Sequence, residues 1–556
     1  MKKGAITILA VVLTVALLLG ACSGNKEAEN SPQASNGADA KPAAERVTPA
    51  GQFPITPEKT TLRVMVKGSS IVENYATNEY TKWLEEKTNV HLEWEVAPEA
   101  TFQEKLNVSL ASGDYPDVLI GMDVSAVQQS IYGKDGVFLP LNDMIEKYGV
   151  ETKRMFEEIP YAKDLITLPD GKIYGLPEIN DCFHCSLGQK MWINKVWLDK
   201  LGLKVPETTE DFYQVLKAFK EQDPNGNHKA DEIPLVGATT GPSTSLDLFI
   251  MSAFVEKDFK LMYVKDGKVH VSYNEQGWKD GLEYLAKLYR EGLIAPQTFT
   301  QDRNQLKQMG MNPEISILGT IASQNNTVYM DIQSERFDDY VAVPPLLGPS
   351  GVRSTAYNPF ALKQGEFVIT DKTKNPEAAF RLADLMYTEE ATLRSTIGRP
   401  GSEWEVPEKG VTGLDGKTQA TWRQITVFGQ LQNVHWAQRG PNLRTNDYRL
   451  NRQAADNPKS LETILYNETL KYEPYALDKS KVVPPLFFTD EQSEELATIE
   501  KTINDYRNEF FAKSVTNNID IDKEWDGYLS NLEKMKLPRM LQIYQEAYDI
   551  YTANHK

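Results

Sequence analysis

The pattern that most constrains the fold of this 556-residue chain is an alternation of strand-like and helix-like segments between residues 60 and 121. Three short stretches have the apolar alternation or the continuous apolar run of a buried strand: Leu62–Val66, Val90–Val96 and Val118–Ile120. Between them, apolar residues recur at helical spacing over residues 80–87 and 102–110. A β-α-β-α-β order is typical of a parallel sheet covered by helices, so we expect an α/β fold.

Later segments repeat this order. Further strands are predicted at Met191–Ile193, Ile315–Ile321 and Phe367–Thr370. Helices are predicted after the capping residues Thr208 to Asp211, over residues 278–289, and from Pro376 onward. The last 70 residues carry only helical stripes. With 41% hydrophobic residues the chain can bury a large core, and at this length two or more domains are expected.

The N-terminus predicts export and a lipid anchor. Lys2 and Lys3 precede an apolar run that ends in Leu19-Gly20-Ala21-Cys22, which resembles the lipobox of bacterial lipoproteins. We therefore expect residues 1–21 to be a signal peptide and Cys22 to carry the lipid, on the extracytoplasmic face of the cell membrane. A plain signal peptide or a short membrane anchor is the alternative. Residues 22–57 are predicted to be the lipidated N-terminus and a disordered tether.

Charge and cysteine content exclude other classes. The net charge is −18 and no Lys/Arg cluster stands out, which argues against nucleic-acid binding. After Cys22 only Cys182 and Cys185 remain, too few for a disulfide framework. Together with His184 they offer three zinc-ligand types, but a structural zinc site needs four ligands. We expect either a local disulfide or two free thiols here.

An oxygen-rich loop follows the predicted helix at 212–219. Its potential ligands are Asp223, Asn225, Asn227, the Lys229 carbonyl, Asp231 and Glu232. The first three occupy positions 1, 3 and 5 of a calcium loop, and Asp231 falls at position 9. The loop departs from an EF-hand, because His228 stands where glycine is expected and Pro234 stands where the bidentate glutamate would be. A calcium loop is predicted, and a solvated turn is the alternative.

Several segments carry a resemblance to a known family. Met191–Lys195 (MWINK), Leu198–Leu203 (LDKLGL) and Val205–Thr208 (VPET) look like one stretch of the extracellular solute-binding proteins that serve ABC importers. Ala111–Val118 (ASGDYPDV) and Asn375–Ala379 (NPEAA) resemble two others. The resemblance covers nearly the whole mature chain and is strongest to the large carbohydrate-binding group, typified by alginate-oligosaccharide binders and Gram-positive lipoproteins.

This resemblance implies a two-lobed periplasmic-binding-protein-like fold with a ligand cleft between the lobes and extra C-terminal helices. We expect residues 58–175 and 360–410 in lobe 1, and residues 176–359 and 411–556 in lobe 2. The implied function is capture of an oligosaccharide, including an acidic one, for delivery to the permease subunits of an ABC importer. A monomer without enzymatic activity is expected, with a structural calcium ion remote from the ligand.

Ligand contacts are nominated by three rules. Ligands bind beyond the carboxyl ends of strands in open α/β sheets, and sugars need aromatic faces and polar groups. Arginine side chains pair with uronate carboxylates. The candidates are Lys67, Ser69, Asp123, Tyr174, Trp192, Ser323, Arg353, Trp404, Trp436 and Arg439.

Two other classes stay open. A lipid-anchored polysaccharide-degrading enzyme would also be large, acidic and rich in aromatic residues, and 78 acidic residues leave room for a catalytic carboxylate pair. The sequence lacks the Gly-x-Ser-x-Gly, His-Glu-x-x-His and phosphate-loop motifs of common hydrolases. A peptide-binding receptor on the same scaffold is the third reading, and it differs only in the cleft.

Overall fold

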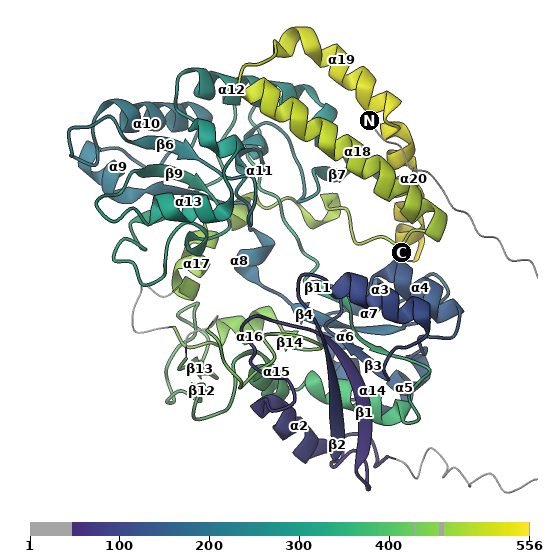
Figure 1. Cartoon of the computed structure of the whole chain (residues 1–556). Coiled ribbons are helices and arrows are strands. Elements are labelled where there is room, and N and C mark those ends of the chain that lie inside the picture. Colours follow the sequence, from purple (N-terminus) through teal and green to yellow (C-terminus); the bar gives the residue numbers. More distant parts are fainter. Residues whose placement is uncertain (1–46, 427–429, 455–460, 555–556) are drawn as a thin grey trace, which may run out of the picture. The chain divides into compact units, whose positions relative to one another are not determined.

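The computed structural model describes residues 47–426, 430–454 and 461–554, and its two principal sheets each carry helices on their faces (Figure 1). One sheet has six strands in the order β14-β4-β11-β3-β1-β2, and the other has four in the order β10-β5-β9-β6. The mixed α/β architecture agrees with the predicted fold class. Cys22 and the predicted signal peptide lie outside the described residues.

The six-stranded sheet begins with the three predicted strands. β1 (Thr60–Lys67) pairs in parallel with β2 (Val90–Ala97) and β3 (Val118–Ile120). The intervening helices α2 (Glu79–Thr88) and α3 (Phe102–Ser112) occur where the helical spacing predicts them. β11 (Leu362–Ile369) is antiparallel to β3 and to β4 (Gly175–Asn180). The parallel arrangement predicted for the first three strands is therefore confirmed, and the antiparallel β11 makes the sheet as a whole mixed.

The four-stranded sheet is also mixed. β5 (Met191–Asn194) is antiparallel to β9 (Leu318–Ala322) and β10 (Tyr340–Val343), whereas β6 (Ile233–Val236) is parallel to β9. Helices α9 (Lys195–Leu201), α10 (Thr209–Glu221) and α12 (Gln276–Arg290) belong to this part of the chain. α10 begins at the predicted capping box, in which Thr208 accepts from the Asp211 backbone N–H.

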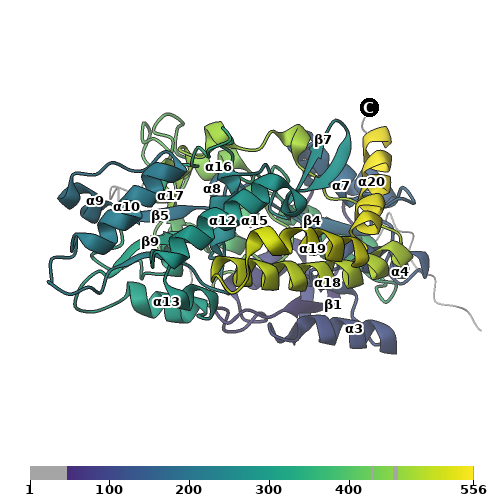
Figure 2. The same cartoon turned by 90° about the horizontal axis from the view of Figure 1, so that it is seen from above.

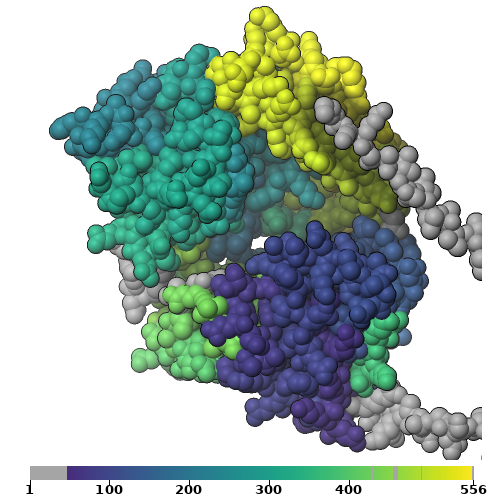
Figure 3. All heavy atoms as spheres, viewed as in Figure 1, coloured from purple at the N-terminus to yellow at the C-terminus, as the bar shows by residue number. Residues whose placement is uncertain are grey.

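Three helices end the described chain: α18 (Asp490–Val515), α19 (Ile521–Lys534) and α20 (Leu537–Asn554). α18 and α19 pack against α12 (Figure 2), and α20 packs against β8 (Lys268–Val271). Phe510 stacks on Tyr528 with ring centroids 4.2 Å apart, and residues of these helices reach the surface coloured yellow in Figure 3. The predicted extra C-terminal helices are therefore present. Among the described residues, no helix combines the length and apolarity that crossing a membrane requires.

The remaining elements are short. The helices are α4 (Ala126–Lys134), α5 (Asn142–Tyr148), α6 (Glu151–Glu158), α7 (Tyr161–Ile166), α8 (Phe183–Ser186), α11 (Leu246–Ile250), α13 (Arg303–Gly310), α14 (Pro376–Met386), α15 (Glu389–Thr396), α16 (Asn446–Leu450) and α17 (Leu461–Thr469). The strands are β7 (Met262–Lys265), β8 (Lys268–Val271), β12 (Trp404–Glu405), β13 (Arg423–Gln424) and β14 (Leu443–Arg444).

Sheet membership differs from the expected lobe boundaries at two places. β4 extends to Asn180 and β14 lies at residues 443–444, yet both belong to the six-stranded sheet. Residues 181–190 and 344–361 therefore connect the six-stranded sheet with the four-stranded one. The division into two moving lobes stays a prediction.

The expected tether is wrong for its last residues. Val47 and Ile55 are buried, and the Arg381 guanidinium donates hydrogen bonds to the carbonyls of Thr48 and Gln52. Residues 47–57 are therefore packed as part of the folded body, because two apolar side chains and an arginine hold them there.

Candidate functional site

A cavity of about 600 Å³ lies between residues of α13 and of the segment after β9 on one side and residues near β14 on the other. Its volume is in the range of pockets that hold small organic ligands. The first group of lining residues is Lys307, Thr327, Met330, Asp331 and Ile332. The second is Thr396, Ile397, Trp422, Gln424, Thr426, Gln438, Arg444, Tyr448, Arg449, Arg452, Leu461 and Glu462.

Arg444 is the most constrained cation of the cavity. It ends β14, and its guanidinium pairs with the carboxylate of Glu178 on the neighbouring strand β4. Nε donates to the Asn442 side chain at 2.8 Å, and Nη1 donates to Gln438 at 2.6 Å. Because both partners of the ion pair are almost fully buried, the pair fixes Arg444 in the wall of the cavity.

Arg449 differs from Arg444 in its partners. Its Nη2 donates to the side-chain oxygen of Asn180, an uncharged group, on the last residue of β4. Its Nε is buried and has no hydrogen-bond partner among the described residues. Burial, reinforced by Arg444, lowers the pKa of this guanidinium. The side chain is thus a cation on the cavity wall with an unused donor.

Two further charges sit beside Arg449. The Nη1 of Arg452 lies 3.7 Å from Oε1 of Glu462, and Oε2 of Glu462 lies 3.9 Å from Nδ1 of His184. Burial alone favours the neutral form of Glu462, but His184, Arg452 and Arg449 together hold its pKa below the usual value. The glutamate therefore stays ionised and offsets part of the positive charge.

The rest of the wall is aromatic and apolar. Trp422 stacks on Tyr448 with ring centroids 5.1 Å apart, and its Nε1 donates to the Tyr448 carbonyl at 2.9 Å. Both rings line the cavity together with Met330 and Ile397. Apolar and aromatic surface combined with a few fixed polar groups is the composition expected of a site for a sugar-like ligand.

None of the ten predicted ligand residues lines this cavity. The rings of Tyr174, Trp192 and Trp436 are fully buried, and Trp404 is nearly so. The polar atom of each ring also donates a hydrogen bond inside the protein. Tyr174 donates to Asp170 and Trp192 to the Ser323 carbonyl. Trp436 donates to Thr81 and Trp404 to the Gly398 carbonyl. Since neither face of a buried ring is free, we assign these four aromatic residues to the core and correct that prediction.

The polar candidates fall into separate places. Lys67 and Asp123 meet at the carboxyl ends of β1 and β3, as predicted, with Nζ 3.0 Å from Oδ2. Arg439 reaches the same end of the sheet, where it donates to the Gly68 carbonyl at 3.3 Å and pairs with Glu99 at 3.0 Å. Ser69 is half-buried in the turn that follows β1.

The other two polar candidates are engaged elsewhere. Ser323 is fully buried, and its hydroxyl donates to the Asn325 carbonyl at 3.1 Å. Arg353 donates to the Pro345 carbonyl and lies over the Tyr475 ring at 4.1 Å. Neither site shows a free guanidinium or hydroxyl facing the cavity.

Sequence reasoning missed the residues that do line the cavity. Arg444, Arg449 and Arg452 fall within nine residues of one another beside Trp422 and Tyr448 in space. The statement that no basic cluster stands out is therefore wrong for this stretch. The sequence feature that could have indicated these cavity residues is a short polar segment, residues 444–452, with three arginines as well as asparagine, threonine and tyrosine.

The loop after α10 is held by hydrogen bonds among the side chains predicted to bind calcium. The carboxylate of Asp223 accepts from the backbone N–H groups of Gly226, Asn227 and His228. The amides of Asn225 and Asn227 donate to the two oxygens of Asp231 at 2.7 and 2.8 Å. Carboxylate and amide groups from alternate residues, which are the ligand types of Ca²⁺, therefore lie within one turn of the chain.

Glu232 adds an independent sign at this loop. Its Oε1 is buried with no hydrogen-bond partner among the described residues. Burial raises the pKa of this carboxyl group, as expected of an acidic group that lacks a cation. The residues present thus fit a bound Ca²⁺.

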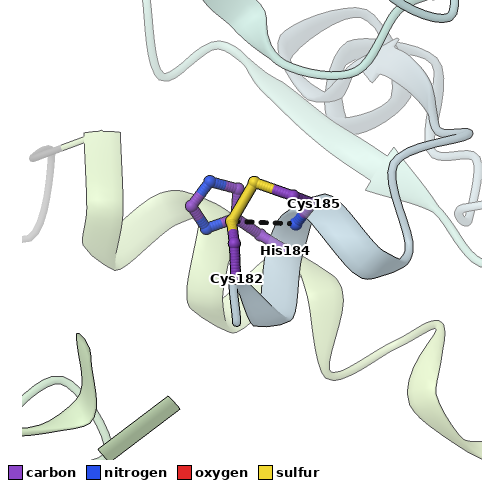
Figure 4. A group of neighbouring side chains, drawn as sticks. All are labelled: Cys182, His184 and Cys185. Atoms are coloured by element: carbon purple, nitrogen blue, oxygen red, sulfur yellow. Dashed lines mark hydrogen bonds between the residues drawn. A yellow bond between two sulfur atoms is a disulfide. The ribbon is translucent and has the colours of Figure 1, made fainter. Parts of the chain in front are cut away.

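Cys182 and Cys185 form a disulfide, which decides between the two predicted states (Figure 4). The bond lies in the segment that leads from β4 to β5. The Cys185 backbone N–H also donates to Sγ of Cys182 at 3.2 Å.

The chain belongs to the family of bacterial extracellular solute-binding proteins, whose pattern matches residues 65–393, more than half of its length. Over 567 aligned positions it is 32% identical to the fructooligosaccharide ABC transporter substrate-binding protein FusA of Streptococcus pneumoniae, with 98% of each chain covered. It is also 26% identical over 370 positions to lipoprotein LipO of Bacillus subtilis, covering 64% of this chain and 70% of LipO. The predicted family is confirmed, and the chain is a solute-binding protein and not an enzyme.

Solved structures agree with the fold. FusA of S. pneumoniae in complex with kestose superposes with a TM-score of 0.73 at 30% identity, covering 89% of this chain and all of FusA. The alginate-binding protein AlgQ2, solved without calcium ion, superposes with a TM-score of 0.64 at 24% identity, covering 89% of this chain and 99% of AlgQ2. A further FusA structure is that of an EF-hand mutant, so calcium or an EF-hand is named for both relatives. The predicted periplasmic-binding-protein-like fold is thereby confirmed.

Proposed function

We propose that this protein is a lipid-anchored extracellular receptor that captures an oligosaccharide and delivers it to an ABC importer. The observation that carries the proposal is the cavity beside Arg449, whose wall includes Tyr448, the almost fully buried Trp422 and three arginines that supply fixed donors. Full-length similarity to a fructooligosaccharide-binding relative supports the same class of ligand. A degrading enzyme is excluded by the family, and a peptide receptor stays the alternative.

The proposed mechanism is capture by closure. The cavity is lined by residues 307–332, next to strands of the four-stranded sheet, and by residues 396–462, which include β14 of the six-stranded sheet. A ligand that contacts both groups stabilises the arrangement in which they are close, and so shifts a hinge equilibrium. The permease subunits would then recognise the closed, loaded form.

Within this class, the cavity favours an acidic oligosaccharide. Arg444 is neutralised by Glu178 and Arg452 is offset by Glu462, whereas the hydrogen-bond partner of the Arg449 side chain within the described residues is the neutral Asn180. A uronate carboxylate would supply the anion that the buried Nε of Arg449 lacks. The arginines predicted for this role, Arg353 and Arg439, lie outside the cavity, and the role passes to Arg449.

A titration with three related sugars tests both levels of the proposal. Isothermal titration of the purified protein with trigalacturonate, with its fully methyl-esterified form and with kestose compares one anionic and two neutral ligands. We expect trigalacturonate to bind about tenfold or more tightly than its ester, because one charge-assisted pair contributes roughly 1.5–3 kcal/mol. We expect Arg449→Gln to abolish that difference, while Arg423→Gln, an exposed arginine paired with Glu405, leaves it unchanged.

The possible outcomes test the class of ligand and the preference for an acidic sugar separately. Equal affinity for the acid and the ester would overturn the acidic preference and leave an oligosaccharide receptor. Failure of every sugar to bind, with binding of a peptide instead, would overturn the oligosaccharide class. Chromatography of the sugars after incubation should show no new products.

Calcium is proposed as a structural ion of the loop after α10. Asp223, Asn225, Asn227, the Lys229 carbonyl, Asp231 and Glu232 would hold it, and the ion would supply positive charge that joins the end of α10 to the start of β6. No residue of this loop lines the cavity, so the ion has no direct contact with the proposed ligand.

The lipid anchor is proposed on the sequence of the N-terminus and on the similarity to a lipoprotein. Cys22→Ala, expressed in a Gram-positive host, should move the protein from the membrane fraction to the culture medium. Retention of the variant in the membrane fraction would contradict anchoring at Cys22. The signal-peptide cleavage site is read from the same samples by mass spectrometry.

A further inference from the structure

The segment from Asp181 to Lys190 joins the two sheets, and it places three metal-ligating side chains in one turn. One ligand atom each of Cys182, His184 and Cys185 lies within 4.8 Å of the other two (Figure 4). Cys182 is buried, and the other two are half-buried. Ligand atoms around a tetrahedral zinc ion are separated by roughly 3 to 4 Å, so only small shifts separate this cluster from a zinc site.

A fourth ligand faces the turn from another element. Glu462 belongs to α17, and its Oε2 is 3.9 Å from Nδ1 of His184. Helices α8 and α17 are packed against each other. Its other oxygen lies 3.7 Å from the Arg452 guanidinium, which would remain as a partner outside the metal shell and orient the carboxylate. Four ligands from this turn and its neighbour are therefore available, which sequence alone did not offer.

The charges of the surroundings suit such a site. Two thiolates, one carboxylate and one imidazole would leave a net negative charge around Zn²⁺, which the guanidinium of Arg452, 3.7 Å from Glu462, offsets in part. The backbone N–H of Cys185 already donates to the sulfur of Cys182, a contact that stabilises a thiolate.

We propose that Cys182, Cys185, His184 and Glu462 form a Zn²⁺ site when the disulfide is reduced, so that this turn alternates between a disulfide-bonded form and a metal-binding form. Reduction takes two electrons and two protons from a dithiol, which is itself oxidised to a disulfide, and yields two thiols. Binding of Zn²⁺ then releases both thiol protons as the sulfurs become metal ligands. The proposal is independent of which solute the protein carries.

The consequence for the molecule follows from the position of Glu462. This glutamate lines the cavity and pairs with Arg452, whereas Asn180 and Asp181, which precede Cys182, contact Arg449 and Arg444. A metal that joins Glu462 to the turn would tie α17 to the connection between the sheets. The redox state of the pair would thereby alter a wall of the cavity.

The test uses the full mature chain with calcium in excess, so that the loop at residues 223–232 is saturated. Protein is reduced with dithiothreitol, freed of reductant by anaerobic gel filtration, mixed with Zn²⁺ and desalted, and its zinc is measured by elemental analysis. We expect about one tightly held Zn²⁺ per reduced chain and none per oxidised chain. Co²⁺ in place of Zn²⁺ should give the near-ultraviolet charge-transfer absorption of thiolate ligation.

Variants decide whether these four side chains are the ligands. Cys185→Ser should lose the site, and His184→Asn and Glu462→Gln should each weaken zinc binding about tenfold or more. His91→Asn is the matched control, because His91 lies in β2 of the six-stranded sheet and pairs with Glu85. This variant should bind zinc as the unsubstituted protein does. His184→Asn keeps the disulfide, so its oxidised form verifies folding by circular dichroism.

Two results would overturn the proposal. One is a reduced protein that retains no more zinc than the oxidised protein. The other is zinc binding that survives Cys185→Ser and His184→Asn undiminished. If Asp223→Ala removes the zinc instead, the metal is in the calcium loop and the proposal is likewise wrong.

Discussion

At the scale of single residues, the expectation that functional side chains follow the carboxyl ends of strands led to a cluster of charged side chains around Asp123. The sequence alone could not show which of these groups are ionised. Lys67 and Asp123 were predicted as ligand contacts at the ends of two strands. In the structure they form an ion pair, and Lys363 joins them, since its Nζ pairs with Asp123 and lies 2.7 Å from Glu366. Glu366 is fully buried, and burial raises its pKa to about 8. Burial also disfavours the charge on Asp123, but Glu366 and the two lysines outweigh it and hold its pKa at about 2. One carboxyl group of the pair thus carries the charge and the other keeps a proton.

Glu366→Gln tests this assignment through the pH dependence of stability. The native pKa of Glu366 lies above its unfolded value of 4.5, so between the two the native state binds more protons than the unfolded state. The free energy of unfolding therefore falls as pH rises through this window, and the glutamine variant lacks that loss. We expect the variant to match the unsubstituted protein near about pH 5 and to exceed it by about 1 kcal/mol or more near about pH 9.

Urea unfolding at the two pH values measures the difference. Glu146→Gln, at a glutamate that is 86% exposed, is the control and should change stability equally little at both. A glutamine variant that is less stable than the parent at high pH would show that Glu366 is ionised and paired.

Residue identity also explains where the sequence misled. Tryptophan and tyrosine suit both a sugar site and a core, and nothing local to Trp192 or Trp436 tells the two apart. Trp436 is buried because Tyr80 and Trp94, more than 340 residues earlier, pack edge-on against its ring. Trp422 is a cavity residue because Arg452 and Tyr448 happen to fold beside it. Such assignments depend on contacts between distant segments, which periodicity does not encode.

At the scale of elements, the loop after α10 is the segment for which residue spacing alone predicted a calcium ion. Its backbone is left-handed at Asp223, Gly226 and His228, which curls the loop. Removing the proposed ion should leave the half-buried carboxylates of Asp231 and Glu232 without a metal counter-charge.

Asp223→Ala, or a calcium chelator, should therefore lower the melting temperature of the protein. When the calcium concentration is about 100 times the dissociation constant, binding adds about 2.7 kcal/mol to the free energy of unfolding. The substitution or the chelator would remove this contribution. Differential scanning calorimetry with and without calcium measures the shift. Asp199→Ala, an exposed residue paired with Lys195, is the control and should shift it little.

Sugar affinity measured well below the melting temperature should be unchanged in Asp223→Ala. The same stability with and without calcium would reduce the loop to an ordinary turn. A loss of affinity at full folding would instead place the ion in the ligand site.

Elements also differ in how far sequence could predict them. β1, β2 and β3 were predicted because each is a contiguous apolar pattern separated by a helix. β14 has only two residues and exists because it pairs with β4, more than 260 residues away. The direction of β11 was equally hidden, since an antiparallel strand and a parallel strand can have the same apolar pattern.

At the scale of the whole molecule, the family resemblance predicted what periodicity could not, namely a solute-binding protein with a periplasmic-binding-protein-like fold. The two sheets are joined by residues 181–190 and 344–361. Two crossings constrain relative motion to a hinge more than a single linker would. Residues 396–462 thus hold both the last strand of one sheet and most of the cavity wall.

Closure on ligand is the prediction that belongs to this scale. A sugar that touches Arg449 on one side and residues such as Asp331 on the other can favour the closed state only by the difference in its affinity for the two states. We expect small-angle X-ray scattering to show a decrease of about 1 Å in the radius of gyration when the best-binding sugar of the panel saturates the protein. Arg449→Gln should need a higher concentration of the acidic sugar to reach the same decrease. Because that variant removes a contact made on binding and leaves the connecting segments intact, its saturated radius should equal that of the parent. A radius that stays constant at saturation would mean that the cavity binds its ligand without a hinge, and recognition by the permease would then depend on the bound ligand itself.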